Sequence, residues 1–103
     1  MVVISKTILN SFCKDYPEVT GALSSWYEVT SQANWKSFSE VRRSFNSTDF
    51  VGNDRYVFNI KGNKFRLIAL IIFRIRTVFI LFVGDHKSYD LVDAKTIRYK
   101  PNR

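Results

Sequence analysis

The stretch Phe65-Arg66-Leu67-Ile68-Ala69-Leu70-Ile71-Ile72-Phe73 contains the longest uninterrupted apolar run of the chain. Successive side chains of a strand point to opposite faces, and here both faces are apolar. One row consists of Phe65, Leu67, Ala69, Ile71 and Phe73, and the other of Ile68, Leu70 and Ile72 with Arg66 at its end. A strand of this kind lies in the middle of a sheet and is covered on both sides. We therefore expect helices over one face and the C-terminal segment or a partner protein over the other.

Two more strand-like stretches, residues 56–60 and 77–83, flank this strand along the chain. The connections are short: Lys61-Gly62-Asn63 before it, where glycine and asparagine tolerate a positive φ, and Arg74-Ile75-Arg76 after it. Short connections force antiparallel pairing, so the three strands are expected to form a meander. The third strand must then end beside the start of the middle one, which brings His86 close to Arg66.

The N-terminal half has helical rather than strand periodicity. Residues 2–4 are β-branched and predict a short edge strand. Apolar residues at helical spacing predict one helix after Ser5 and a second opened by Pro17, and Ser37-Phe38-Ser39-Glu40 matches a capping box for a third near residues 38–45. We expect a loop at residues 46–48 and a helical turn within residues 87–93. Residues 1–103 should thus form one α+β domain, with an N-terminal helical hairpin packed on a small antiparallel sheet.

Composition excludes several classes of function. The 103 residues, 46% of them hydrophobic, suffice for one core. The single cysteine, Cys13, leaves no internal disulfide and no cysteine-based zinc site, and with a single histidine as well we expect no metal and no cofactor. The longest apolar run is too short to span a bilayer, and the N-terminus lacks a signal-peptide pattern. We therefore expect a cytoplasmic protein without a membrane partner.

Positive charge is concentrated in the second half of the chain. Residues 1–50 balance five basic side chains against five acidic ones, whereas residues 51–103 carry eleven basic and four acidic ones, which gives the whole net charge of +7. Clustered lysine and arginine are typical of surfaces that face a polyanion such as RNA. The alternative is a solvated basic surface that binds nothing.

Several short motifs occur in an order that is specific as a set. They are Trp26-Tyr27, Ala33-Asn34-Trp35-Lys36, Asp49-Phe50-Val51-Gly52-Asn53, Val57-Phe58-Asn59-Ile60-Lys61-Gly62-Asn63-Lys64-Phe65-Arg66-Leu67 and Phe82-Val83-Gly84-Asp85-His86-Lys87-Ser88-Tyr89-Asp90. With these motifs the sequence resembles the HigB-type toxins of bacterial type II toxin–antitoxin systems, within the RelE-like superfamily. The resemblance implies a RelE-like fold, endoribonuclease activity on mRNA, usually on the translating ribosome, and inhibition by a cognate antitoxin. That antitoxin would be a helix-turn-helix protein and would make any contact with operator DNA.

Metal-independent RNA cleavage uses the 2′-hydroxyl as an internal nucleophile, and it needs a proton acceptor, a proton donor and positive charge at the phosphate. His86 is the natural base or acid, and Tyr89, three residues later, could donate a proton or stack on a base. Lys64 and Arg66 alternate onto one face of their strand and could grip one phosphate. These four are the predicted catalytic residues. The alternatives are a histidine that only caps a helix or ends a strand, and a tyrosine packed on the core.

Four more cations are candidate RNA contacts: Lys61, Arg74, Arg76 and Lys87. The lysine in the hairpin turn would contact the RNA backbone or stay solvated, and the two arginines at the far end of the middle strand suit ribosomal RNA or free surface. Asp85 could raise the affinity of His86 for a proton or cap the following turn. The competing interpretation of the whole chain is a non-catalytic RNA- or antitoxin-binding module on the same fold.

Overall fold

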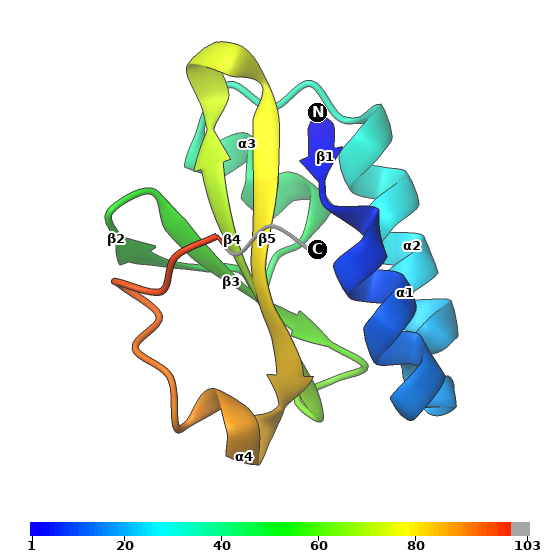
Figure 1. The fold of residues 1–103 in the computed structure, drawn as a ribbon. Helices are drawn as coiled ribbons and strands as arrows, with labels where there is room; N and C mark the ends of the chain where they lie inside the picture. Colours follow the sequence, from blue (N-terminus) through cyan, green and yellow to red (C-terminus); the bar gives the residue numbers. More distant parts are fainter. Residues whose placement is uncertain (100–103) are drawn as a thin grey trace.

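A five-stranded sheet organises residues 1–99, the part of the chain that the computed structural model describes (Figure 1). The strands are β1 (Val2–Ile4), β2 (Asp49–Gly52), β3 (Arg55–Ile60), β4 (Phe65–Ile72) and β5 (Thr77–Asp85). The helices are α1 (Lys6–Asp15), α2 (Thr20–Gln32), α3 (Phe38–Ser44) and α4 (His86–Tyr89), with one-turn 3-10 helices at Pro17–Val19 and Phe73–Ile75. The predicted α+β fold class is confirmed.

The strand order is β1-β5-β4-β3-β2. β3, β4 and β5 form the expected antiparallel meander, and the short edge strand β1 pairs with β5 in parallel. β4 is therefore central, as its two apolar faces predicted. At the start of β4, Phe65 lies opposite Ile60 of β3 and Asp85 of β5. The end of β3, the start of β4 and the end of β5 therefore meet at the same end of the sheet.

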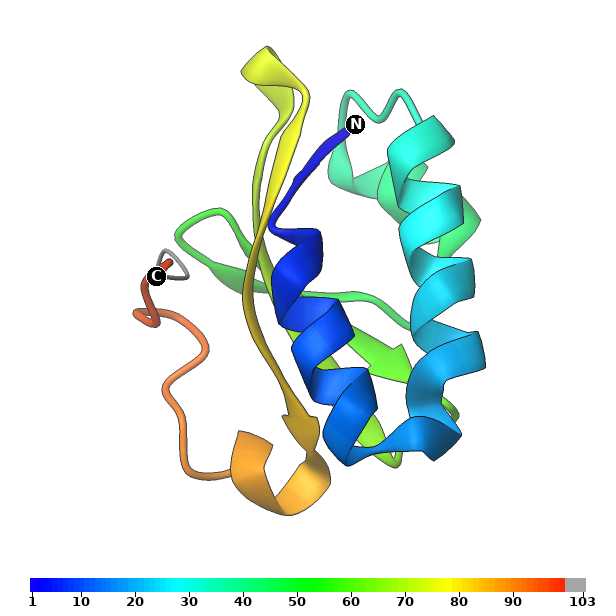
Figure 2. The same cartoon turned by 45° about the vertical axis from the view of Figure 1, so that its right-hand side comes forward.

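The helices cover one face of the sheet, with the α1–α2 hairpin standing against it in Figure 2. Trp26 of α2 is almost fully buried, and its ring centroid lies 5.4 Å from that of Phe58 in β3. The first apolar row of β4 joins the same core, with Leu67 and Ala69 wholly buried. Complete burial of a large apolar side chain stabilises a fold by about 1.5–3 kcal/mol. This layer therefore supplies most of the apolar burial that holds the sheet in shape.

The C-terminal segment covers the other face of the sheet, on the side away from the helices (Figure 2). Ile97 and Tyr99 of this segment pack with Ile68 of β4, and the ring centroid of Tyr99 lies 5.7 Å from that of Phe79. Arg55 fastens the segment, because its Nε and Nη2 atoms donate hydrogen bonds of 3.2 and 2.8 Å to the carbonyl oxygen of Ile97. The sequence left open whether the C-terminal segment or a partner protein covers this face, and the structure shows the C-terminal segment there.

One strand was not predicted, and one predicted motif is absent. β2 was missed because Asp49–Gly52 is only four residues long and its register shifts between Phe50 and Gly52. Ser37 does precede α3, but its hydroxyl lies 3.3 Å from the Ser39 hydroxyl and makes no capping hydrogen bond. The predicted capping box is therefore absent.

The turns also differ from expectation. In the β3–β4 turn, the positive φ values belong to Lys61 (52°) and Gly62 (67°) rather than to a glycine–asparagine pair. β4 ends one residue early, because Phe73 begins a 3-10 turn that Arg76 closes with a φ of 53°. Pro17 opens a 3-10 turn as well, and α2 begins only at Thr20. Within the described residues, no helix has both the length and the apolar character needed to cross a membrane.

Candidate active site

The predicted proximity of Arg66 and His86 follows directly from the strand register. Arg66 of β4 lies opposite Gly84 of β5, two residues before the histidine. The backbone N–H of His86 also donates a hydrogen bond of 3.2 Å to the carbonyl oxygen of Lys64. The start of β4 and the start of α4 are therefore joined at one end of the sheet, the end where α4 lies in Figure 1.

A single capping interaction holds α4 in place. Asp85 is its N-cap, and the Oδ1 atom of this residue accepts a 2.7 Å hydrogen bond from the backbone N–H of Ser88. This hydrogen bond, with a further one from the Ser88 side chain and the nearby charges of Lys87 and His86, lowers the pKa of the Asp85 carboxyl. Of the two roles considered for Asp85, the structure shows the cap, which fixes the direction in which α4 leaves β5.

His86 is exposed at the start of α4 and has an acidic neighbour one turn later. Its Nδ1 atom lies 3.4 Å from Oδ2 of Asp90, and the two side chains are 53% and 62% exposed. The carboxylate can orient the ring and favour a proton on Nδ1, which leaves Nε2 for exchange with a ligand. The centroid of the Tyr89 ring lies 6.5 Å from that of His86.

The guanidinium group of Arg66 is held between two side chains. Its Cζ atom lies 5.4 Å from the centroid of the Tyr89 ring, and its Nη1 atom donates a hydrogen bond to Oδ1 of Asn59 in β3. Its Nε atom is buried and has no hydrogen-bond acceptor among residues 1–99. Tyr89 is half-buried against the core on the C-terminal-segment side of the sheet, so its ring offers the cation a restrained π face.

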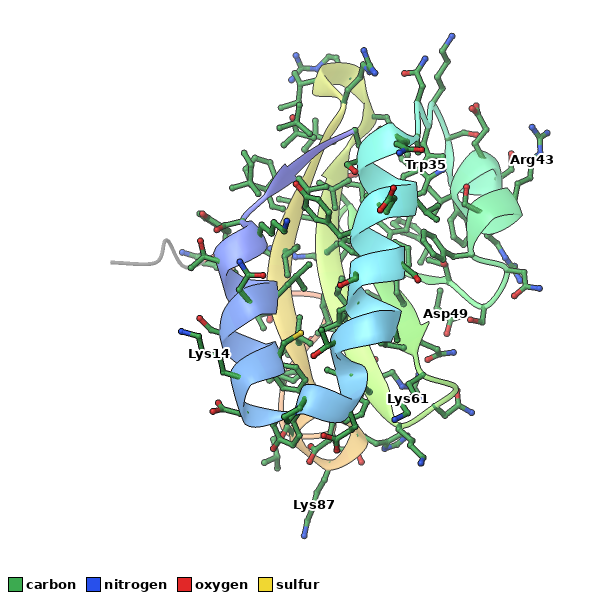
Figure 3. The ribbon with its side chains drawn as sticks, turned by 90° about the vertical axis from the view of Figure 1, so that its right-hand side faces the viewer. Lys14, Trp35, Arg43, Asp49, Lys61 and Lys87 are labelled. Atoms are coloured by element: carbon green, nitrogen blue, oxygen red, sulfur yellow. The ribbon has the colours of Figure 1, made fainter. Side chains whose placement is uncertain are left out.

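The remaining predicted cations divide between the two ends of the sheet. Lys64 lies exposed in the turn immediately before β4, whereas the sequence had placed it within the strand. Lys61 and Lys87 lie at the same end of the molecule (Figure 3), and Nζ of Lys61 donates a 3.1 Å hydrogen bond to the carbonyl oxygen of Glu18. Arg74 and Arg76 are exposed at the opposite end, in the β4–β5 turn, as the sequence indicated.

Two residues of this end were missed by the sequence reasoning. Asn59 lies opposite Arg66 in the β3–β4 ladder, and counting back from the hairpin turn would have found that pair. Asp90 is four residues after His86, a spacing that places two side chains on one face of a helix. No group of three or more histidine, cysteine or acidic residues that could hold a metal ion occurs in the described part of the chain.

Comparison with known proteins identifies the family. Residues 19–92 match the model of the HigB toxins, described as the RelE-like toxic component of a toxin–antitoxin system. The chain belongs to this family. The match covers Asn59, Arg66, His86, Tyr89 and Asp90, and the resemblance inferred from the motifs is confirmed.

Curated HigB proteins are similar to this HigB-type toxin over nearly their whole length. An mRNA interferase HigB of Escherichia coli O6:H1 is 30% identical over 105 aligned positions, which cover 100% of this chain and 99% of the relative. The mRNA interferase toxin HigB of Escherichia coli K12 is 29% identical over 96 positions, 91% of this chain and 92% of the relative. An mRNA interferase HigB of Shigella flexneri shows the same values.

Proposed function

We propose that this HigB-type toxin is an mRNA endoribonuclease that cuts messages during their translation and so inhibits growth. The observation that carries the proposal is the position of Arg66, which is held against Tyr89 beside the exposed His86. A cation, a phenol and an imidazole in one place are the groups that RNA cleavage requires. The names of the curated relatives, all mRNA interferases, support the same activity.

The proposed reaction is transfer of the phosphate to the neighbouring 2′-hydroxyl. The 2′-oxygen forms a bond to phosphorus while the bond to the 5′-oxygen breaks, which leaves a cyclic phosphate and a 5′-hydroxyl end. His86 takes or gives the proton through Nε2, with Asp90 at Nδ1. Arg66 and Lys64 bind the phosphate, whose negative charge increases in the transition state. Tyr89 holds the guanidinium with its ring and presents its hydroxyl for proton transfer or for contact with a base.

The other cations extend the RNA contact beyond the cut phosphate. Lys87 is exposed on α4, next to His86, and it contacts the message on one side. Lys61 contributes its charge from the β3–β4 turn. Arg74 and Arg76 lie too far along β4 to reach the same phosphate and bind ribosomal RNA instead. In this scheme the ribosome presents the message to the site, and no metal or cofactor takes part.

The toxin family also implies an antitoxin partner. We take this partner to be a small helix-turn-helix protein that carries all contact with operator DNA, and we place the toxin in the cytoplasm, where the translating ribosomes are. A reading frame for such a protein beside the toxin gene is the expected finding, and its absence would favour a binding module over a toxin.

The proposal is tested by expressing the protein from an inducible promoter and mapping the ends of cellular mRNA. We expect wild type to slow growth and to create new 5′-hydroxyl ends within coding regions. His86→Ala and Arg66→Ala should lose both effects, while Lys14→Ala, which removes an exposed cation on α1, should keep them. If the wild type makes no new ends but still binds its antitoxin, the nuclease proposal is wrong and the chain is a binding module.

A further inference from the structure

Asn59 is the side chain that meets Arg66 across the β3–β4 ladder. The two residues are directly paired in the register, so their side chains point to the same face of the sheet. On that face Nη1 of Arg66 donates its hydrogen bond to Oδ1 of Asn59. The amide nitrogen of Asn59 lies 3.5 Å from the carbonyl oxygen of Ser47, which assigns the amide oxygen to the arginine.

The usual partner of a half-buried arginine is a carboxylate, whereas the partner of Arg66 is the neutral amide of Asn59. A carboxylate would hold the guanidinium more strongly but would also neutralise its charge. The one ion pair found in residues 1–99 joins His86 and Asp90, so no carboxylate pairs with Arg66 in this part of the chain. A neutral amide fixes the direction of the guanidinium and leaves its full positive charge for an anion.

The hydrogen-bonding capacity of Arg66 also leaves room for an anion. A guanidinium has five N–H donors, and Asn59 engages Nη1 while Tyr89 lies against the π face. The Nε donor has no acceptor in the described residues, but it is buried and therefore not accessible to a ligand. Nη2 makes no hydrogen bond within the described residues and is not among their buried atoms, so it is the donor that remains for an incoming phosphate oxygen.

We infer that Asn59 is a positioning residue that aims the guanidinium of Arg66 at the scissile phosphate without lowering its charge. The inference rests on the proposed nuclease function, and it assigns to Asn59 a role in the transition state rather than in folding. Asn59 then has two separable effects: it restrains the guanidinium, and this restraint speeds the reaction.

The restraint is tested without any activity. Rotation about the Cζ–Nη bonds of Arg66 is followed by nitrogen NMR on the labelled protein, with Arg66→Ala used to assign the signals. We expect slow rotation in wild type, fast rotation in Asn59→Ala and unchanged slow rotation in Asn34→Ala, which removes an exposed amide from the loop after α2. Equal rotation in wild type and Asn59→Ala overturns the inference, whether or not the protein cuts RNA.

The role in the reaction is tested by a double-mutant cycle on cleavage in a purified translation system. Loss of a hydrogen bond to a charged group predicts a fall of about 10- to 100-fold in kcat for Asn59→Ala. The double variant with Arg66→Ala should be no slower than Arg66→Ala alone. Asn59→Asp keeps the contact but neutralises the cation, so it should raise KM and lower kcat. Additive losses in the cycle overturn the inference, whereas an inactive wild type would instead refute the proposed function.

Discussion

Gly84 of β5 lies directly opposite Arg66 of β4, and the ring of Phe82, two residues before Gly84 on β5, occupies the space that a Cβ atom of residue 84 would need. A Cβ atom at residue 84 would lie 2.4 Å from Cζ of that ring, closer than any real contact. We therefore expect Gly84→Ala to displace Phe82 and the end of β5, at a cost of about 1–3 kcal/mol in the free energy of unfolding. Because α4 follows immediately, RNA cleavage should fall as well. Urea unfolding and mapping of RNA ends measure the two effects.

Gly21→Ala is the matched control for this change. Gly21 lies exposed in the first turns of α2, and nothing is within 4 Å of the position its Cβ would take. Alanine is the better helix former, so the variant should be more stable by about 0.5–1 kcal/mol and should keep full activity. If both glycine variants behave alike, the steric explanation for Gly84 is wrong.

Asp90 should contribute much less to activity than His86. The pair is largely exposed, and an exposed ion pair contributes at most about 1 kcal/mol, which corresponds to a few-fold change in rate. We expect Asp90→Asn to lower the rate of RNA cleavage a few-fold and His86→Ala to lower it by about 100-fold or more, the usual size of a general acid–base contribution. Rate measurements in the purified translation system show which of the two variants loses more activity. A larger loss for the aspartate would make Asp90 the proton acceptor.

The proximity of Arg66 and His86 could be predicted from sequence because it depends only on strand order. Short connections allow one pairing, and that pairing fixes which strand ends meet. The Asn59 partner follows from the same register, because it lies opposite Arg66 in the β3–β4 ladder. The contact of the guanidinium with Tyr89 could not be predicted, because it depends on how α4 packs against the sheet. β2 was missed for a related reason, since so short a strand exists only through its pairing with β3.

The cap of α4 predicts a specific dependence on pH. The hydrogen bond from Ser88 lowers the pKa of Asp85 from its ordinary value of 3.8. A carboxyl with a lowered pKa in the folded state stabilises the fold above its unfolded pKa, and this stabilisation disappears as the pH falls through the folded value. We expect the amide protons of α4 to exchange faster as the pH drops below about 4, after correction for intrinsic exchange. Asp85→Asn keeps a capping oxygen that does not titrate, so a pH response that persists in this variant would exclude the cap as its source.

Arg55 should be the residue that keeps the C-terminal segment on the sheet. Two of its nitrogen atoms donate to the single carbonyl oxygen of Ile97, and Nη1 donates to its neighbour Asn53 at 2.8 Å. The side chain is half-buried, so we expect Arg55→Ala to lower the free energy of unfolding by about 1–2 kcal/mol. Hydrogen exchange should rise first in residues 92–97, because these lie on the sheet without a regular element of their own. Arg98→Ala, which removes an exposed cation from the same segment, should leave exchange unchanged. Equal effects of the two variants would mean that apolar packing alone holds the segment.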